Sequence, residues 1–259
     1  MVESALELIA NETLEKIVLA RRADYLFDAP VDAAVLQHRI RGVTSNCYHF
    51  LLQPGPRSAF MGTTPERLFR RTGTRIQSEV LAGTRVRGDT QEQDLGLARD
   101  LLGSGKDQRE HDIVRKSIRQ RLHLLCSSLL VDDQAGLLRL ERKQHLHSRV
   151  SGELRPGVGD ADLIAALHPT PAVGGYPSDL AVHEIQRLEP FRRGWYAAPV
   201  GWVSKTGAEF AVAIRSGLVH GHTVSVYSGA GIVRGSVPSE EWEEIEAKIG
   251  DFQKVVRPA

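Results

Sequence analysis

The order of helical and β-type segments predicts an α+β fold with antiparallel sheets. Strand-like segments come in runs with helices between the runs, whereas a doubly wound parallel sheet needs a regular strand–helix alternation. The 259 residues, 41% of them hydrophobic, are enough to bury a sizeable core. No Ser-rich or low-complexity linker marks a boundary, so we expect a single domain over residues 1–259.

The first half of the chain alternates helices with a series of strands. Leu6, Ile9 and Ala10 share one face of a predicted helix over 2–15, and KIVLARRADYLF predicts a strand over 16–27. Pro30 introduces a helix over 31–40. Gly and Pro then separate β-type segments at 47–53, 58–64, 66–73 and 74–84. Helices are expected over 89–103 and 106–130, the second long and strongly amphipathic.

The second half returns to strands and ends in a helix. A strand is expected over 137–154, a short helix over 160–167 and a helix over 178–188. Residues 168–177, HPTPAVGGYP, hold too many Pro and Gly for a regular element. Gly-bounded strands fill 194–236, and the last helix covers about 238–254.

Composition excludes several classes of protein. The formal net charge of +1 shows no basic excess for nucleic acid, and no stretch approaches the roughly 18 apolar residues of a membrane span. Cys47 and Cys126 stand far apart and predict a reducing compartment. The acidic, helix-like N-terminus is neither a signal peptide nor an Arg-rich transit peptide, so we expect a soluble cytoplasmic protein.

Two acidic helical turns are candidates for a metal site. Asp107 and Glu110 are three residues apart on one predicted helix, and Glu241 and Glu244 are three apart on another. This spacing puts both carboxylates of a pair on one helix face, and two opposed faces would form an oxygen cage suited to Mg²⁺. Spacing alone also fits solvated carboxylates that complement the helix dipole.

Other segments carry weaker signals, each with a structural alternative. Lys248 lies one turn after Glu244 and could reach an anionic ligand or form a surface ion pair. The small residues of SGAGIV (228–233) allow close backbone approach to a carboxylate, or form a tight turn. His168 lies in the Pro/Gly-rich segment, which predicts a rigid, shaped loop.

Two further side chains suit acid–base chemistry. Lys16 enters an apolar strand, where burial would lower its pKa toward that of a general base; a strand-end lysine reaching solvent is the alternative. Glu66 follows a proline and precedes an apolar run, so desolvation would raise its pKa and let it donate a proton; the alternative is a surface turn.

Seven stretches in order, from about residue 14 to 254, resemble the chorismate-utilising enzymes. That family contains isochorismate synthase, salicylate synthase and the large subunits of anthranilate and aminodeoxychorismate synthase. LHPTPAVGG and APVGW look most like isochorismate synthases, and Ala172 stands where the ammonia-using members usually carry threonine. The stretches are EKIVLAR, FMGTTPERLF, EVLAGTRVRG, KDQREHDIV, LHPTPAVGGYP, RRGWYAAPVGWVSKTGAEFAVAIRS and YSGAGIVRGSVPSEEWEEIEAK.

The resemblance implies a fold and a set of roles. The fold is a four-layer α/β/β/α sandwich of two packed antiparallel sheets. Lys16 is the general base that activates water for attack at C2 of chorismate, and Glu66 is the general acid at the C4 hydroxyl. Glu110 and Glu244 are the principal Mg²⁺ ligands. Asp107 and Glu241 assist, and Asp107, standing where Glu is common, would reach the metal through water. The substrate is held by Gly83, Thr84, His168, Ala172, Tyr196, Arg215, Gly229, Gly231 and Lys248.

Three activities remain open. Isochorismate synthase is favoured, salicylate synthase would also eliminate pyruvate, and a truncated chorismate-binding protein would bind without turnover. Family members commonly carry a longer N-terminal segment before the Lys16 strand, so the chain is expected to be a minimal version or to lack part of an outer sheet. A monomer is expected, with a dimer as the alternative. The pathway, to menaquinone, a siderophore or salicylate, is left open.

Overall fold

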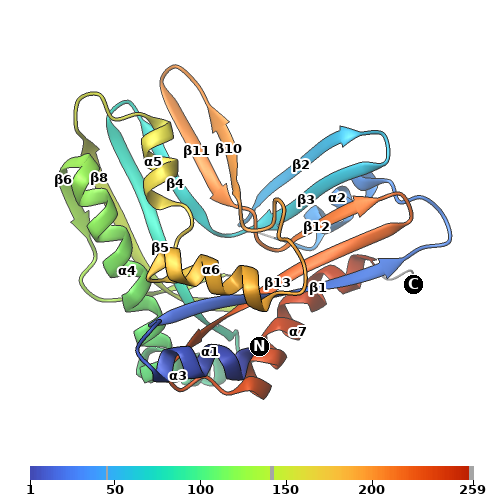
Figure 1. The fold of residues 1–259 in the computed structure, drawn as a ribbon, viewed down its shortest axis with the longest axis horizontal. Coiled ribbons are helices and arrows are strands. Elements are labelled where there is room, and N and C mark those ends of the chain that lie inside the picture. Colours follow the sequence, from blue (N-terminus) through green and yellow to red (C-terminus); the bar gives the residue numbers. More distant parts are fainter. Residues whose placement is uncertain (45, 141–142, 257–259) are drawn as a thin grey trace.

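The computed structural model describes residues 1–44, 46–140 and 143–256 and arranges their strands in two antiparallel sheets (Figure 1). The sheets are flanked by helices, so the α+β prediction is confirmed. The helices are α1 (Val2–Ala10), α2 (Ala33–Gly42), α3 (Gln91–Gly103), α4 (Gly105–Leu125), α5 (Asp160–Leu167), α6 (Ser178–Leu188) and α7 (Pro238–Val256).

The six-stranded sheet joins the start of the chain to its end. Its order is β2-β3-β12-β13-β1-β9, with β1 (Lys16–Leu26) between β13 (Thr223–Val233) and β9 (Gly175–Tyr176). In register, Lys16 faces Val233 on one side and Tyr176 on the other. The remaining strands are β2 (Tyr48–Gly55), β3 (Ser58–Thr64) and β12 (Ser216–His220).

The seven-stranded sheet is built from the middle of the chain. Its order is β10-β11-β4-β5-β8-β6, and β7 also pairs with β8. A bulge in β5 between Ala82 and Thr84 contains Gly83, which adopts a positive φ of 74°. The strands are β4 (Arg67–Thr72), β5 (Arg75–Val86), β6 (Cys126–Val131), β7 (Gly136–Arg139), β8 (Lys143–Leu154), β10 (Pro199–Val203) and β11 (Gly207–Val212).

Each sheet has its own helices and its own apolar cluster. Helices α1, α2, α6 and α7 pack on the six-stranded sheet, and α3 and α4 pack on the seven-stranded one. One cluster centres on Ile17, Met61 and Ile232, and the other on Phe69, Val80 and Leu122. Ala20 and Tyr227, from β1 and β13, belong to the second cluster, so the two sheets share apolar contacts. Burial on both sides explains why β1 begins with five consecutive buried residues.

Most predicted elements match the structure, and several differ. The helix predicted over 2–15 ends at Ala10, and the segment 168–177, predicted to hold no regular element, contains the two-residue strand β9. Residues 126–130, predicted as the end of a long helix, form strand β6, because Leu125 ends α4 and the chain then pairs with β8. Residues 137–154 were predicted as one strand but contain β7 and β8, with 141–142 outside the described residues. Among the strands predicted over 194–236, AEFAVAIRSGLVH (208–220) was expected to be one strand but divides into β11 and β12 around residues 213–215, and Arg215 adopts a positive φ of 48°.

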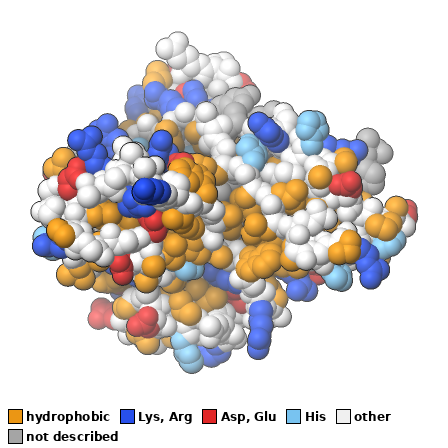
Figure 2. All heavy atoms as spheres, turned by 90° about the horizontal axis from the view of Figure 1, so that it is seen from above, with side chains coloured by type: hydrophobic (Ala, Val, Ile, Leu, Met, Phe, Trp, Pro, Cys, Tyr) orange, Lys and Arg blue, Asp and Glu red, His pale blue; other side chains and the backbone are white. Residues whose placement is uncertain are grey.

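The face in Figure 2 carries hydrophobic side chains over its middle and basic side chains toward its margins. Large exposed hydrophobic residues include Leu52 on β2 and Trp202 on β10, which are the edge strands of the two sheets. None of the helices in the described part of the chain is long and apolar enough to cross a membrane.

Candidate active site

A cavity lies between the two sheets, with both contributing to its wall. The seven-stranded sheet supplies the 81–84 segment of β5, and the six-stranded sheet supplies Ser228, Gly229 and Gly231 of β13. Helices α4 and α7 close one end. The sequence-predicted residues that line the cavity are Glu66, Gly83, Thr84, Glu110, Ala172, Tyr196, Arg215, Gly229, Gly231, Glu244 and Lys248.

Lys16 lies directly behind this wall. As the first residue of β1 it is fixed on both sides by strand pairing, and its side chain is 0% exposed. Its Nζ atom lies 2.9 Å from Oε1 of Glu110 on α4. A Cβ atom at Gly231 would lie 2.3 Å from that same Oε1, so only glycine leaves room for the pair. The buried ammonium is thus neutralised by a carboxylate that itself lines the cavity.

Glu66 faces the same cavity from the other sheet. It precedes β4, and its backbone N–H donates to Oγ1 of Thr64 at 3.2 Å. The residue is 8% exposed. Burial raises the pKa of the carboxyl to about 7, against the lowering effect of Lys16, while Glu79 raises it further. Near neutral pH this group holds a proton that it can donate.

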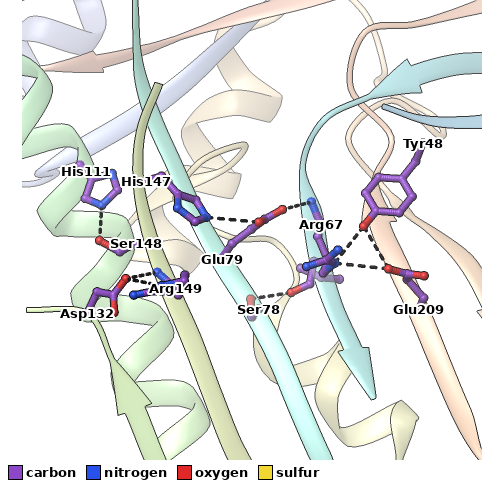
Figure 3. Close-up of polar contacts among 11 residues, drawn as sticks. Tyr48, Arg67, Ser78, Glu79, His111, Asp132, His147, Ser148, Arg149 and Glu209 are labelled. Atoms are coloured by element: carbon purple, nitrogen blue, oxygen red, sulfur yellow. Dashed lines mark hydrogen bonds and ion pairs between the residues drawn. The ribbon is translucent and has the colours of Figure 1, made fainter. Parts of the chain in front are cut away.

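Glu79 belongs to a polar network that connects the sheets next to Glu66 (Figure 3). Its Oε1 accepts from the backbone N–H of Arg67 at 3.2 Å, and its Oε2 lies 3.4 Å from Nε2 of His147. The Arg67 guanidinium donates to the Tyr48 hydroxyl, which in turn donates to Glu209 at 3.0 Å. The backbone on the C-terminal side of Glu66 is therefore held from β2, β5 and β11. Sequence reasoning missed this network, because its members lie on separate strands.

Three glutamates at the α4–α7 end are each paired with a lysine. Glu110 pairs with Lys16, Glu244 pairs with Lys248 at 2.6 Å, and Glu241 pairs with Lys106. Burial raises the pKa of Glu241, and Lys106 opposes that effect. At Glu244 burial also acts to raise the pKa, but Lys248, Lys106 and Lys16 together hold it below its usual range.

The same carboxylates are the candidate metal ligands. Over residues 1–44, 46–140 and 143–256, no three His, Cys, Asp or Glu side chains gather closely enough to hold a metal ion. Glu241 nevertheless has a buried Oε2 without a hydrogen-bond partner among the described residues, and Glu110 and Glu244 border the cavity. An uncompensated buried carboxylate oxygen suits a cation. Asp107, in contrast, pairs with Arg85 at 3.0 Å and does not line the cavity.

Another part of the cavity wall suits a carboxylate. Tyr196 stacks on Tyr227, and burial raises the pKa of its hydroxyl to about 12, so the hydroxyl remains a donor. A Cβ at Gly229 would lie 3.0 Å from that hydroxyl, so the glycine keeps the approach open. Lys248 donates to the carbonyl of Gly229 at 2.9 Å, and Arg215 lines the same region.

The structure places a different histidine in the cavity from the one that the resemblance implied. His168 lines a neighbouring cavity of about 740 Å³, which shares Val173 and Tyr196 with the first. His145 of β8 lines the candidate site itself, and its Nδ1 lies 2.9 Å from Oγ1 of Thr84. Burial and the nearby Arg215 lower the pKa of His145 to about 3, so the ring is neutral. Strand alternation places His145 and His147 on one face, a signal that sequence reasoning had available but did not use.

The Pro/Gly-rich loop 168–177 is fixed by two arginines. Arg121 of α4 donates to the carbonyls of residues 166, 167 and 169 at 3.1, 3.2 and 2.9 Å, and also to the Ser178 hydroxyl. Arg193 donates to the carbonyls of Val173 and Val18, both at 2.7 Å, and pairs with the buried Glu189. Ala172 and Val173 are thereby held at the cavity wall, as the shaped-loop prediction requires.

Comparisons with known proteins show what the whole chain is similar to. Residues 1–257 match the model of the family described as chorismate binding enzyme. The chain is 42% identical over 256 residues to isochorismate synthase 2 of Arabidopsis thaliana, covering 98% of this chain and 46% of that protein. It is 39% identical over 257 residues to isochorismate synthase MenF of Escherichia coli strain K12, covering 99% of this chain and 59% of that protein.

Solved structures show the same similarity. The menaquinone-specific isochorismate synthase MenF from Escherichia coli superimposes with a TM-score of 0.92, covering 99% of this chain and 59% of that one, at 39% identity. Anthranilate synthase component I from Streptococcus pneumoniae gives a TM-score of 0.84 at 27% identity, covering 99% and 56%. The chain spans about half the length of the curated relatives it matches.

Proposed function

Because the chain belongs to the family of chorismate binding enzymes, we propose that it isomerises chorismate to isochorismate. One observation carries the proposal. Glu66, with a pKa of about 7, and the buried Lys16–Glu110 pair meet at a single cavity between the sheets. A proton donor and a candidate proton acceptor at one site suit a reaction in which water enters and water leaves.

In this proposal Lys16 and Glu66 divide the proton transfers. The Lys16 ammonium first loses a proton, and its free amine then accepts one from the water that adds at C2; the ring double bonds shift, and Glu66 protonates the C4 hydroxyl, which departs as water. One water enters and one leaves, so substrate and product are isomers. Each turnover leaves Lys16 protonated and Glu66 ionised, and a proton passed back through solvent restores both groups.

The charged ends of the substrate have separate binding groups. Chorismate carries two carboxylates, and Arg215 with the Tyr196 hydroxyl would hold the one on the enolpyruvyl group, close to the backbone of Gly229 and Gly231. Lys248 would lie toward the second carboxylate, on the ring. His145, neutral and bonded to Thr84, would contact the ring without adding charge.

Mg²⁺ is the proposed cofactor. Glu110, Glu241 and Glu244 would hold it, on the strength of the unpartnered Oε2 of Glu241 and the position of the other two at the cavity. Bound there, it would neutralise the ring carboxylate of the substrate. Asp107, paired with Arg85, would support the site only through water.

The names of the relatives favour this reaction over its neighbours. The proteins from Arabidopsis thaliana and Escherichia coli are isochorismate synthases. The test is to incubate the purified chain with chorismate and Mg²⁺, separate the products by chromatography, and repeat the run with a chelator. Isochorismate formed only with Mg²⁺ supports the proposal, whereas salicylate with pyruvate would identify a salicylate synthase. Chorismate binding by calorimetry without turnover would identify a binding protein.

A further inference from the structure

Lys106 makes a contact that its own helix does not explain. It is the second residue of α4, and its Nζ donates to Oε1 of Glu241 on α7. The positive end of a helix dipole lies at its N-terminus, so a lysine in the first turn is disfavoured there by its own helix. The acceptor is a carboxylate that is 1% exposed, and it supplies the favourable interaction instead.

The surrounding charges balance while Lys106 is in place. Each of the three carboxylates has one lysine as its partner. The pairs are Glu110 with Lys16, Glu241 with Lys106 and Glu244 with Lys248. Lys106 also interacts electrostatically with Glu244 and Glu110. It therefore adds positive charge near all three carboxylates, as a divalent cation bound by them would.

Of these lysines, Lys106 is the one that can leave. Lys16 is fully buried at the start of a paired strand, and Lys248 also donates to the carbonyl of Gly229. The Lys106 side chain is 24% exposed, and the hydrogen bond that it makes is to Glu241. Its long, flexible side chain can swing into solvent without disturbing β1 or β13.

We propose that Lys106 is a displaceable counter-ion that occupies the acidic cluster until a divalent cation replaces it. Without the metal it neutralises Glu241, whose burial would otherwise leave an unpaired charge. With the metal it moves out, so it competes with the metal and sets its affinity. This inference rests on the proposed Mg²⁺ site but not on the reaction.

The test measures metal binding in the absence of chorismate. Mg²⁺ and Mn²⁺ are titrated by calorimetry into the chain and into Lys106→Met, which retains the length of the side chain but removes its charge. Lys116→Met is the matched control, because Lys116 is an exposed lysine of the same helix α4. We expect Lys106→Met to bind the metal about tenfold more tightly or better, equivalent to about 1.4 kcal/mol. Lys116→Met and Lys106→Arg should retain the parent affinity.

Thermal unfolding provides a second measurement. In chelator Lys106→Met should melt below the parent, and saturating Mg²⁺ should remove that difference, because the metal then neutralises Glu241. If Lys106→Met folds only when Mg²⁺ is present, its stability depends on the metal even more strongly, which also supports the inference. Unchanged or weaker metal binding by Lys106→Met, or a loss of stability that Mg²⁺ does not reverse, would overturn the inference.

The two proposals fail in different ways. In one outcome Lys106→Met binds the metal more tightly while the parent shows no chorismate turnover. That result would reject the proposed isomerase activity and support the proposed role of Lys106 as a counter-ion. Mg²⁺-dependent turnover by the parent, with equal metal affinity in the parent and in Lys106→Met, would reject the counter-ion role of Lys106 and support the isomerase activity.

Discussion

Nζ of Lys16 lies 2.9 Å from Oε1 of Glu110, an ion pair that joins the first residue of β1 to helix α4. The pair is possible because position 231, on the neighbouring strand β13, is glycine. It places the proposed base in contact with a proposed metal ligand. A substitution that displaces Lys16 or Glu110 should therefore affect both proton transfer and metal binding.

Replacing Lys16 with Met should remove turnover but leave binding. Methionine fills the buried space and cannot accept a proton, so kcat should fall about 100-fold or more, the usual contribution of general base catalysis. Chorismate affinity, measured by calorimetry, should change no more than a few-fold, because Arg215, Tyr196 and Lys248 remain. Turnover is followed with an isochorismatase-coupled assay. Lys205→Met, at an exposed turn, is the control, and full activity in Lys16→Met would reject the base assignment.

Glu66 should give activity an upper pH limit. Its carboxyl must be protonated to act, and its pKa is about 7, so the turnover rate should fall as pH rises through that value. Glu66→Gln should be nearly inactive at every pH, since the amide cannot deliver the proton. A pH–rate profile of the parent that is flat from pH 6 to 8.5 would contradict the assignment of Glu66 as the acid.

The same carboxyl should make stability depend on pH. Its pKa is raised from 4.5 in the unfolded chain to about 7 in the folded one, so the native state binds the extra proton between those values. The free energy of unfolding contributed by Glu66 therefore decreases as pH rises from about 4.5 to 7. Glu66→Gln lacks this pH dependence. Its free energy of unfolding minus that of the parent should therefore be up to about 3 kcal/mol larger at pH 8 than at pH 5. Denaturant unfolding at both pH values measures the difference, and no change in it would show that Glu66 is not desolvated.

Gly231→Ala should break the Lys16–Glu110 pair. The added Cβ would lie 2.3 Å from Oε1 of Glu110, so that side chain must move. We expect a fall in both Mg²⁺ affinity and turnover of about tenfold or more, since a ligand and the partner of the base are displaced together. Gly96→Ala on helix α3, where a new Cβ meets nothing, is the matched control and should stabilise the helix slightly. Unchanged metal affinity in Gly231→Ala would place the metal away from Glu110.

Arg121→Met should loosen the loop that carries Ala172 and Val173. The guanidinium donates to two carbonyls at the end of α5, to the loop carbonyl of Pro169 and to the Ser178 hydroxyl, and its loss leaves those acceptors unsatisfied. We expect a loss of about 2–4 kcal/mol in the free energy of unfolding and a higher KM, with a smaller effect on kcat. Arg119→Met, an exposed arginine on the same helix, should change neither. If KM is unchanged, the loop does not shape the substrate site.

Much of the fold could be predicted from sequence, because strand and helix periodicities are local. Strand 58–64 and helices 160–167 and 178–188 match the structure residue for residue. Residues 126–130 could not be assigned this way. Their apolar pattern continues that of α4, and only pairing with the distant β8 makes them a strand.

The site was harder to predict than the fold. The resemblance identified side chains that the structure brings to one cavity, among them Glu66, Glu110 and Glu244. It assigned the ring site to His168, whereas His145 lines the cavity. It also gave no role to Lys106, whose importance depends on a carboxylate of another helix that no local pattern connects to it.

The pairing of β1 with β13 has a consequence for how the chain acquires activity. Lys16 and Val233 are adjacent in the sheet although nearly the whole sequence separates them, so the contact order at the site is high. During synthesis most of β1 has no strand partner until β13 has emerged, since β9 pairs with only its first two residues. Neither half of the chain can assemble the cavity alone, and recovery of turnover after dilution from denaturant should report completion of the last long-range folding step.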